Sequence, residues 1–193
     1  MLKIKYVILI FLFPFSVFAQ QKFEKEVAFG GNSGVTLSKM SFVPSLKQNY
    51  RLGYNGGLSL RFISEKYFGL QTELNFSQRG WESDTILAPR TLNYIELPFL
   101  THLTFGQKKL RVIIHLGPKI SYFLSDDSDI KYKFDYGICG GGGLELRTRK
   151  LSYVLEGRYY FGLSDIFPNG KGDEFSRSSN QDISVGLTVL WNK

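Results

Sequence analysis

The stretch FGLQTELNFS, residues 68–77, decides the fold because apolar and polar side chains alternate through it without a break. Its even-numbered positions carry Phe, Leu, Thr, Leu and Phe, and its odd-numbered positions carry Gly, Gln, Glu, Asn and Ser. A period of two places successive side chains on opposite faces of a β-strand. The same alternation recurs over residues 110–120, 151–162 and 183–191. The chain is therefore predicted to be all-β.

The spacing of the alternating stretches predicts a barrel. Eight candidate strands cover residues 26–37, 52–63, 67–80, 92–105, 110–124, 134–147, 151–163 and 181–191. The connections between them are long and short in strict alternation, which is typical of transmembrane barrels with tight periplasmic turns and long outer loops. Several strands exceed the roughly 9–11 residues that cross a bilayer at a steep tilt. We predict an eight-stranded antiparallel up-and-down transmembrane β-barrel with both termini on the periplasmic side.

Composition supports one folded domain of this kind. The chain has 193 residues, of which 43% are hydrophobic and 21% are charged, so it is too apolar to be a disordered chain. Its one cysteine, Cys139, excludes an intramolecular disulfide and a Cys-rich metal framework. The formal net charge of +7 is spread along the chain, so nucleic acid is not an expected partner.

The N-terminal segment has the pattern of an export signal. Lys3 and Lys5 precede an apolar run over residues 6–18, and Ala19 and Val17 place small side chains where a signal peptidase reads them. The apolar run would rise only about 20 Å as a helix, short of a ~30 Å hydrocarbon core. We expect a cleaved Sec signal peptide over residues 1–19 and a barrel domain over residues 20–193. Loss of two lysines and no acidic residue lowers the net charge from +7 to +5.

Alternation alone does not say which face of the barrel is inside. A transmembrane barrel turns its apolar face to lipid, whereas a soluble, lipocalin-like barrel turns it inward around a ligand. The polar face favours the first arrangement because its charges are nearly balanced, and an eight-stranded barrel is just wide enough for side chains to fill. We expect ion pairs to plug the lumen and no open channel. The charged residues of this face are Arg61, Glu73, Glu96, Arg111, Lys119, Glu145, Arg147, Glu156 and Arg158.

Glycine and aromatic positions carry two further predictions. Gly140–Gly143 fall inside the sixth strand, where glycine permits a tight bend or a close approach. The alternative, a phosphate-binding loop, lacks the following helix and the Lys-Ser/Thr pair. Several aromatic residues near strand ends are expected to form girdles at the membrane surfaces, with ordinary core packing as the alternative. They are Tyr122, Tyr136, Tyr159, Phe161 and Trp191.

Four motifs resemble the PorT-like family of outer-membrane β-barrel proteins. They are LNYIELPFL (residues 92–100), GPKISYFL (117–124), DYG followed by GGGLE (135–145) and GRYYFGLSDI (157–166), in the family's order. The resemblance extends over about residues 27–191, and it implies an eight-stranded barrel in a Gram-negative outer membrane. The family's namesake is linked to type IX protein secretion and gliding. The resemblance supplies no catalytic residues.

The candidate chemistry is sparse. If Phe105 pairs with Leu110, His102 and His115 point inward as diagonal neighbours near Glu96, about 7–8 Å apart by Cα. A metal or acid–base pair could be built from them, but a third and fourth ligand are not evident, so a buried polar network is the preferred interpretation. We assign no catalytic, cofactor-binding or metal-binding residue and expect no cofactor. Cys139 is expected to be a buried, inert thiol.

The two ends of the barrel offer partner surfaces. Asp-rich stretches at residues 125–129 and 165–173 lie in long connections, and neither has the Gly and final Glu of an EF-hand loop. Basic residues gather in the predicted periplasmic turns, where lipid head groups or a periplasmic or outer-membrane protein would be the partner. They are Lys66, Lys108, Lys109, Arg147, Arg149 and Lys150.

Three functional hypotheses follow. The leading one is an integral outer-membrane barrel with a structural or interaction role, accessory to protein secretion if the family resemblance holds. The second is a soluble periplasmic barrel that binds a small ligand in an apolar interior. The third is a lipid-modifying outer-membrane enzyme, whose activity would depend on His102 or His115.

Overall fold

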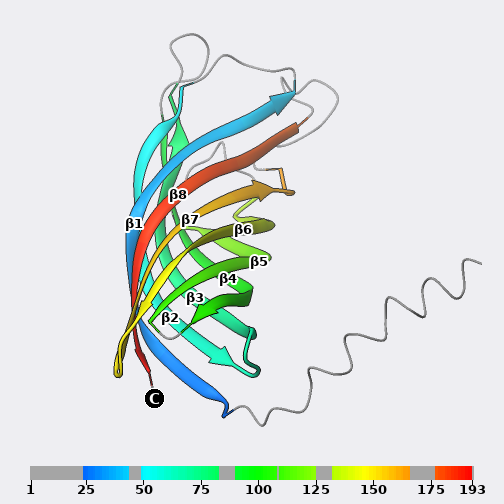
Figure 1. Cartoon of the computed structure of the whole chain (residues 1–193). Coiled ribbons are helices and arrows are strands. Elements are labelled where there is room, and N and C mark those ends of the chain that lie inside the picture. Colours follow the sequence, from blue (N-terminus) through cyan, green and yellow to red (C-terminus); the bar gives the residue numbers. More distant parts are fainter. Residues whose placement is uncertain are drawn as a thin grey trace, which may run out of the picture.

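The chain forms a closed barrel of eight antiparallel strands (Figure 1). The computed structural model describes residues 24–43, 49–82, 90–107, 109–124, 132–165 and 177–192. Each strand pairs with its neighbours in sequence, and the last strand pairs with the first to close the barrel. The strands are β1 (Glu26–Val43), β2 (Arg51–Ile63), β3 (Phe68–Trp81), β4 (Arg90–Gln107), β5 (Leu110–Phe123), β6 (Phe134–Arg147), β7 (Leu151–Gly162) and β8 (Arg177–Asn192). The predicted fold class is confirmed.

Six of the eight strands begin and end close to the predicted positions. The main difference lies at the seam between β1 and β8. Strand β1 runs on beyond residue 37 to Val43, and β8 begins before residue 181, at Arg177. There Val43 pairs with Arg177 and Ser38 with Asp182, so each extension is paired by the other. The β8 extension, residues 177–180, is the polar run Arg-Ser-Ser-Asn without alternation, which is why the sequence pattern did not include it.

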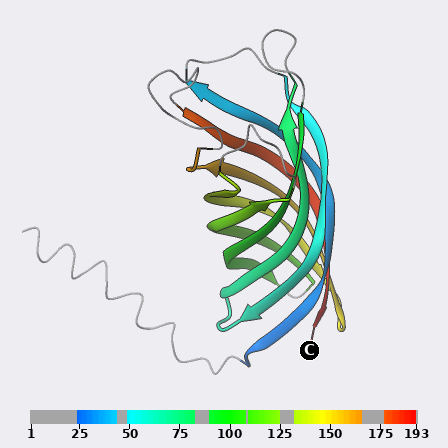
Figure 2. The ribbon, with the colours of Figure 1, turned by 180° about the vertical axis from the view of Figure 1, so that it is seen from behind.

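The short turns all lie at one end of the barrel. Residues 64–67, 108–109 and 148–150 join strands at the end that also holds the start of β1 and the C-terminus (Figures 1 and 2). The strand ends joined by the longer connections lie at the opposite end. The predicted alternation is confirmed, and we call the short-turn end the periplasmic end and the other the outer end. Residues 1–23 lie outside the described residues, so the signal peptide stays a prediction.

The outward face of the barrel is apolar and the inward face is polar. Along β2, Leu58 and Leu60 are 69% and 49% exposed, whereas the alternate residues Ser59 and Arg61 are buried. The five aromatic residues predicted near strand ends are all exposed on the outward face, which fits a girdle and not a core. A soluble barrel with an apolar interior requires the opposite polarity, so that hypothesis is wrong. Within the described residues, no helix is long and apolar enough to cross a membrane.

The glycine run sits in the middle of β6, at a close approach to β7. Gly141 pairs with Arg158 and Gly143 with Glu156, and a Cβ on either glycine would collide with a backbone carbonyl of β7. The prediction of a close approach is confirmed. A phosphate-binding loop is wrong here, because β6 continues as a strand to Arg147.

Candidate functional site: the polar interior

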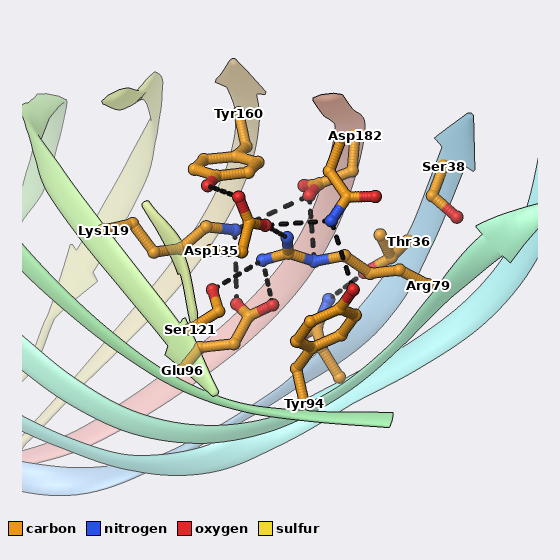
Figure 3. Close-up of polar contacts among 12 residues, drawn as sticks. Thr36, Ser38, Arg79, Tyr94, Glu96, Lys119, Ser121, Asp135, Tyr160 and Asp182 are labelled. Carbon is orange, nitrogen blue, oxygen red and sulfur yellow. Dashed lines mark hydrogen bonds and ion pairs between the residues drawn. The ribbon is translucent and has the colours of Figure 1, made fainter. Parts of the chain in front are cut away.

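The outer half of the barrel interior holds a group of ion-paired side chains around Arg79 of β3. Arg79 faces Glu96 of β4, Lys119 of β5, Asp135 of β6 and Asp182 of β8 (Figure 3). All five side chains are buried, and they come from five of the eight strands. We call these five residues the outer cluster.

Arg79 uses the whole guanidinium group. Its Nη1 lies 3.0 Å from Asp135 Oδ2, its Nε lies 3.2 Å from Asp182 Oδ2, and its Nη2 pairs with Glu96. Lys119 Nζ lies 3.2 Å from Glu96 Oε2 and 3.6 Å from Asp182 Oδ2. Two cations therefore face three carboxylates. Because a charge buried without a partner is costly, this near balance is what allows the cluster to exist in the interior.

Two tyrosine rings enclose the outer cluster (Figure 3). The Arg79 guanidinium lies 5.1 Å from the ring centre of Tyr94 and 4.6 Å from that of Tyr160, and Lys119 Nζ lies 3.9 Å from the Tyr160 ring centre. Such cation–π contacts favour a desolvated cation. The Tyr160 hydroxyl also donates to Asp135 Oδ1 at 3.0 Å. The tyrosines thus exclude water from the charges and hold one carboxylate in place.

A second group, which we call the inner cluster, fills the middle and the periplasmic half of the interior. Arg61 Nη1 lies 2.9 Å from Glu145 Oε1, and Arg61 Nε donates to Gln71 at 2.8 Å. Arg158 donates to both oxygens of Glu73, at 2.7 and 2.8 Å. A two-pronged arginine–carboxylate contact fixes orientation as well as charge. These bonds link strands on opposite sides of the barrel, since β2 and β6, and likewise β3 and β7, are four strands apart in the closed ring of eight.

The two histidines join the inner cluster as a linear chain. His102 and His115 pair directly across β4 and β5, and His102 Nδ1 lies 2.8 Å from His115 Nε2. His115 Nδ1 lies 2.6 Å from Glu156 Oε1. The predicted inward direction is confirmed, but the diagonal placement is wrong because Gln107, not Phe105, pairs with Leu110. The carboxylate partner is Glu156, whereas Glu96 belongs to the outer cluster.

The predicted polar face is largely confirmed. Arg61, Glu73, Glu96, Lys119, Glu145 and Glu156 are buried, Arg111 and Arg158 are half-buried, and Arg147 pairs with Glu26 near the periplasmic end. Sequence reasoning missed Arg79, Asp135 and Asp182. The signal was present for Arg79, because it keeps the phase of Glu73, Asn75 and Ser77 along β3. Asp135 appeared only as part of a family motif. Asp182 lies at the start of β8, where the sequence does not alternate and so does not mark it as inward-facing.

Little free space remains between the two clusters. A cavity of about 50 Å³ lies where they meet, lined by Glu73, Glu96, Lys119, Arg158 and Asp182 among others. Cys139 packs there with Leu100 and Tyr160 and is buried, as predicted. Across the described ranges, no three His, Cys, Asp or Glu side chains are placed to hold a metal ion. His102 and His115 are buried in the interior, away from the outer end.

A closed barrel with an apolar exterior and an ion-paired interior defines the class of transmembrane β-barrel proteins. The chain belongs to the family described as the outer membrane protein beta-barrel domain, which it matches over residues 18–168. No curated protein matches the chain.

Solved structures of outer-membrane barrels are similar to this chain in fold. The outer membrane protein OprG from Pseudomonas aeruginosa is 12% identical with a TM-score of 0.58, over 88% of this chain and 95% of its own. Neisserial surface protein A is 11% identical with a TM-score of 0.51, over 84% of this chain and 97% of its own. The outer membrane enzyme PagL is 14% identical with a TM-score of 0.46, over 86% and 98% of the two chains. At these identities the likeness to OprG and to Neisserial surface protein A shows the fold alone.

Proposed function

We propose that this protein is an integral outer-membrane barrel that acts through its ends, as a structural or interaction protein, and not as a channel. The observation that carries the proposal is the packed interior. Two ion-paired clusters built from strands around the barrel leave a cavity of only about 50 Å³ between them. The ion pairs Arg61–Glu145 and Arg158–Glu73 cross the interior from β2 to β6 and from β7 to β3. Their side chains therefore obstruct a path for a solute along the barrel axis.

Two measurements test this proposal together. Unheated protein from the outer-membrane fraction is expected to migrate differently in a detergent gel from the boiled sample, because a closed barrel resists unfolding by detergent. The same folded protein in a planar lipid bilayer is expected to give no stable conductance steps. Recovery of the protein in the soluble periplasm would contradict the membrane location. Regular conductance steps from the folded protein would contradict the plugged interior.

The periplasmic end is the favoured partner surface. Lys66, Lys109, Arg149 and Lys150 are exposed there, whereas Glu65 and Glu24 are the exposed acidic residues described at that end. A surface with this excess of cations attracts anionic groups of a partner protein or of lipid. Replacement of Lys109, Arg149 and Lys150 by Ser is expected to weaken recovery of a chemically cross-linked partner. Lys39→Ser near the outer end is the control and is expected to leave recovery unchanged.

The resemblance to PorT-like proteins supports a finer version of the proposal, an accessory role in type IX-like protein secretion. A deletion strain is then expected to retain in the periplasm proteins that the parent strain exports, and a plasmid copy is expected to restore export. Normal export in the deletion strain would overturn the secretion role. It would leave the membrane barrel itself to be judged by the gel and bilayer measurements.

A further inference from the structure

An apolar groove crosses the lipid-facing wall formed by β2, β3, β4 and β5. It encloses about 320 Å³ and is lined by the side chains of Leu60, Phe62, Leu70, Phe99 and Leu116, among others. Small-molecule sites occupy roughly 300–1,000 Å³, so the groove is large enough for part of a lipid. Leu70 and Leu116 are more than half exposed, so the lining is open to the bilayer.

The groove lies where two prolines interrupt the wall. The paired register of β3 and β4 stops at Thr72↔Phe99 and resumes at Asn75↔Glu96, around Pro98. The register of β4 and β5 stops at Pro98↔Lys119 and resumes at Thr101↔Leu116, beside Pro118. Proline has no N–H to donate to a ladder, so two neighbouring ladders are weakened at one place. The groove is therefore part of the wall and does not depend on one movable side chain.

The two threonine hydroxyls in the groove are hydrogen-bonded within the protein. The Thr72 hydroxyl donates to the Pro98 carbonyl at 3.1 Å, and the Thr101 hydroxyl donates to the Leu116 carbonyl at 2.8 Å. An unpaired donor facing hydrocarbon would cost several kcal/mol. Because both hydroxyls are bonded to the backbone, the groove presents a surface that suits a hydrocarbon chain.

Towards the periplasmic end, the turn between β2 and β3 and the end of β4 carry groups suited to a lipid head group. The rings of Tyr67 and Phe105 stack with their centres 6.2 Å apart, and Lys66 Nζ lies 5.0 Å from the Tyr67 ring centre. Thr104 N donates to Tyr67 O at 3.0 Å, which fastens the turn to β4. Aromatic rings favour the membrane–water interface, and lysine binds phosphate. Lys66 is exposed in the short turn between β2 and β3.

We propose that the groove and Lys66 together hold one phospholipid of the periplasmic leaflet, with an acyl chain along the groove and the phosphate at Lys66. The inference rests on the membrane location proposed above, because at this depth hydrocarbon is the available occupant. Leu70 of the groove is three residues along the chain from Tyr67 and four from Lys66. The site joins an apolar groove to a cation at the interface.

Native mass spectrometry of the whole protein, purified from outer membranes in a mild detergent, tests the site. The wild type is expected to retain one phospholipid. Leu116→Trp, which fills the groove with a side chain still suited to lipid, is expected to lower the lipid-bound fraction at least fivefold, and Lys66→Ser at least threefold. Leu187→Trp on β8 and Lys25→Ser just before β1 are the matched controls and are expected to retain the lipid.

Three outcomes would overturn the lipid site. They are a wild type that carries no phospholipid, equal retention in all four variants, and an adduct whose mass is that of a lipopolysaccharide or a second copy of the chain. The gel-mobility shift is measured on the same samples. A protein that shifts but holds no phospholipid refutes the lipid site alone, whereas a protein that does not shift refutes the membrane barrel on which the site rests.

Discussion

Replacing Arg79 by Met should destabilise the barrel more than any exposed charge substitution. Among the described residues, Arg79 is the one side chain that contacts Glu96, Asp135 and Asp182 together. It also lies over the rings of Tyr94 and Tyr160. Methionine fills much of the same space without charge. The substitution therefore leaves three buried carboxylates with Lys119 as the nearest remaining cation.

The size of the effect follows from these contacts. Removing one partner of a buried ion pair costs about 3–5 kcal/mol, because the other charge stays buried. Loss of the cation–π contacts adds roughly 0.5–1 kcal/mol for each ring. Lys119 partly compensates, since its Nζ lies 3.2 Å from Glu96 and 3.6 Å from Asp182. We expect the free energy of unfolding to fall by about 4 kcal/mol.

Reversible urea unfolding in lipid vesicles, with gel mobility of unheated samples as the measure of folded protein, checks this value. Arg149→Met at the exposed periplasmic turn is the control and should change the free energy by less than about 0.5 kcal/mol. The triple variant Arg79→Met, Glu96→Gln, Asp135→Asn leaves one Lys119–Asp182 pair and should recover at least half of the loss. If Arg79→Met lowers the free energy of unfolding by less than about 1 kcal/mol, the view that these charges depend on one another is refuted.

Three further predictions use the same unfolding assay. His115→Phe should lower the free energy of unfolding by about 3 kcal/mol, because both His102 and Glu156 lose a hydrogen bond. His102→Phe should lower it by about 1.5 kcal/mol. Equal losses would contradict the linear chain. Gly141→Ala should lower the free energy of unfolding by about 1–3 kcal/mol, since its Cβ would meet the backbone of β7. Gly157→Ala should be tolerated, because its Cβ would lie 4.0 Å from Ser184 O. The reverse order would argue against the close approach. Leu58→Arg, in the middle of the lipid-facing side of β2, should cost about 2–4 kcal/mol in a bilayer, and a neutral result would argue against a lipid-facing position.

The wall of the barrel could be predicted because its information is local. A strand with one face in lipid and the other in a packed interior repeats every two residues, and residues 68–77 show this without interruption. The alternation of short and long connections then gave the topology. The extensions of β1 (SKMSFV, residues 38–43) and β8 (RSSN, residues 177–180) were missed because neither alternates between polar and apolar residues.

The error at the histidines has a simple physical origin. The alternation predicts a turn over residues 106–109 between β4 and β5, but Gln107 pairs with Leu110, so β4 runs on to Gln107. The resulting shift is two residues, and a shift of two leaves every side chain on its own face. Both imidazoles therefore point inward as predicted, yet they are direct partners in place of diagonal ones. Direct pairing is what makes the short chain to Glu156.

The contacts across the interior could not be predicted from one sequence. Arg158 and Glu73 are 85 residues apart, and Arg79 and Asp135 are 56 apart. Which side chains meet depends on how far each strand is displaced along its neighbour around the whole barrel. Alternation identifies the residues that point inward, but it carries no information about the partner that each one finds.

The seam between β1 and β8 makes the last strand a condition for the rest of the barrel. Ala28 pairs with Asn192 and Val43 with Arg177. The edge of β1 that does not face β2 is therefore hydrogen-bonded only when β8 is present. Until then the chain is a sheet with two open edges, which neither lipid nor a packed interior can satisfy. A product that stops before residue 177 would lack β8, and both edges of its sheet would stay unpaired. Closure of the barrel therefore requires complete synthesis of β8.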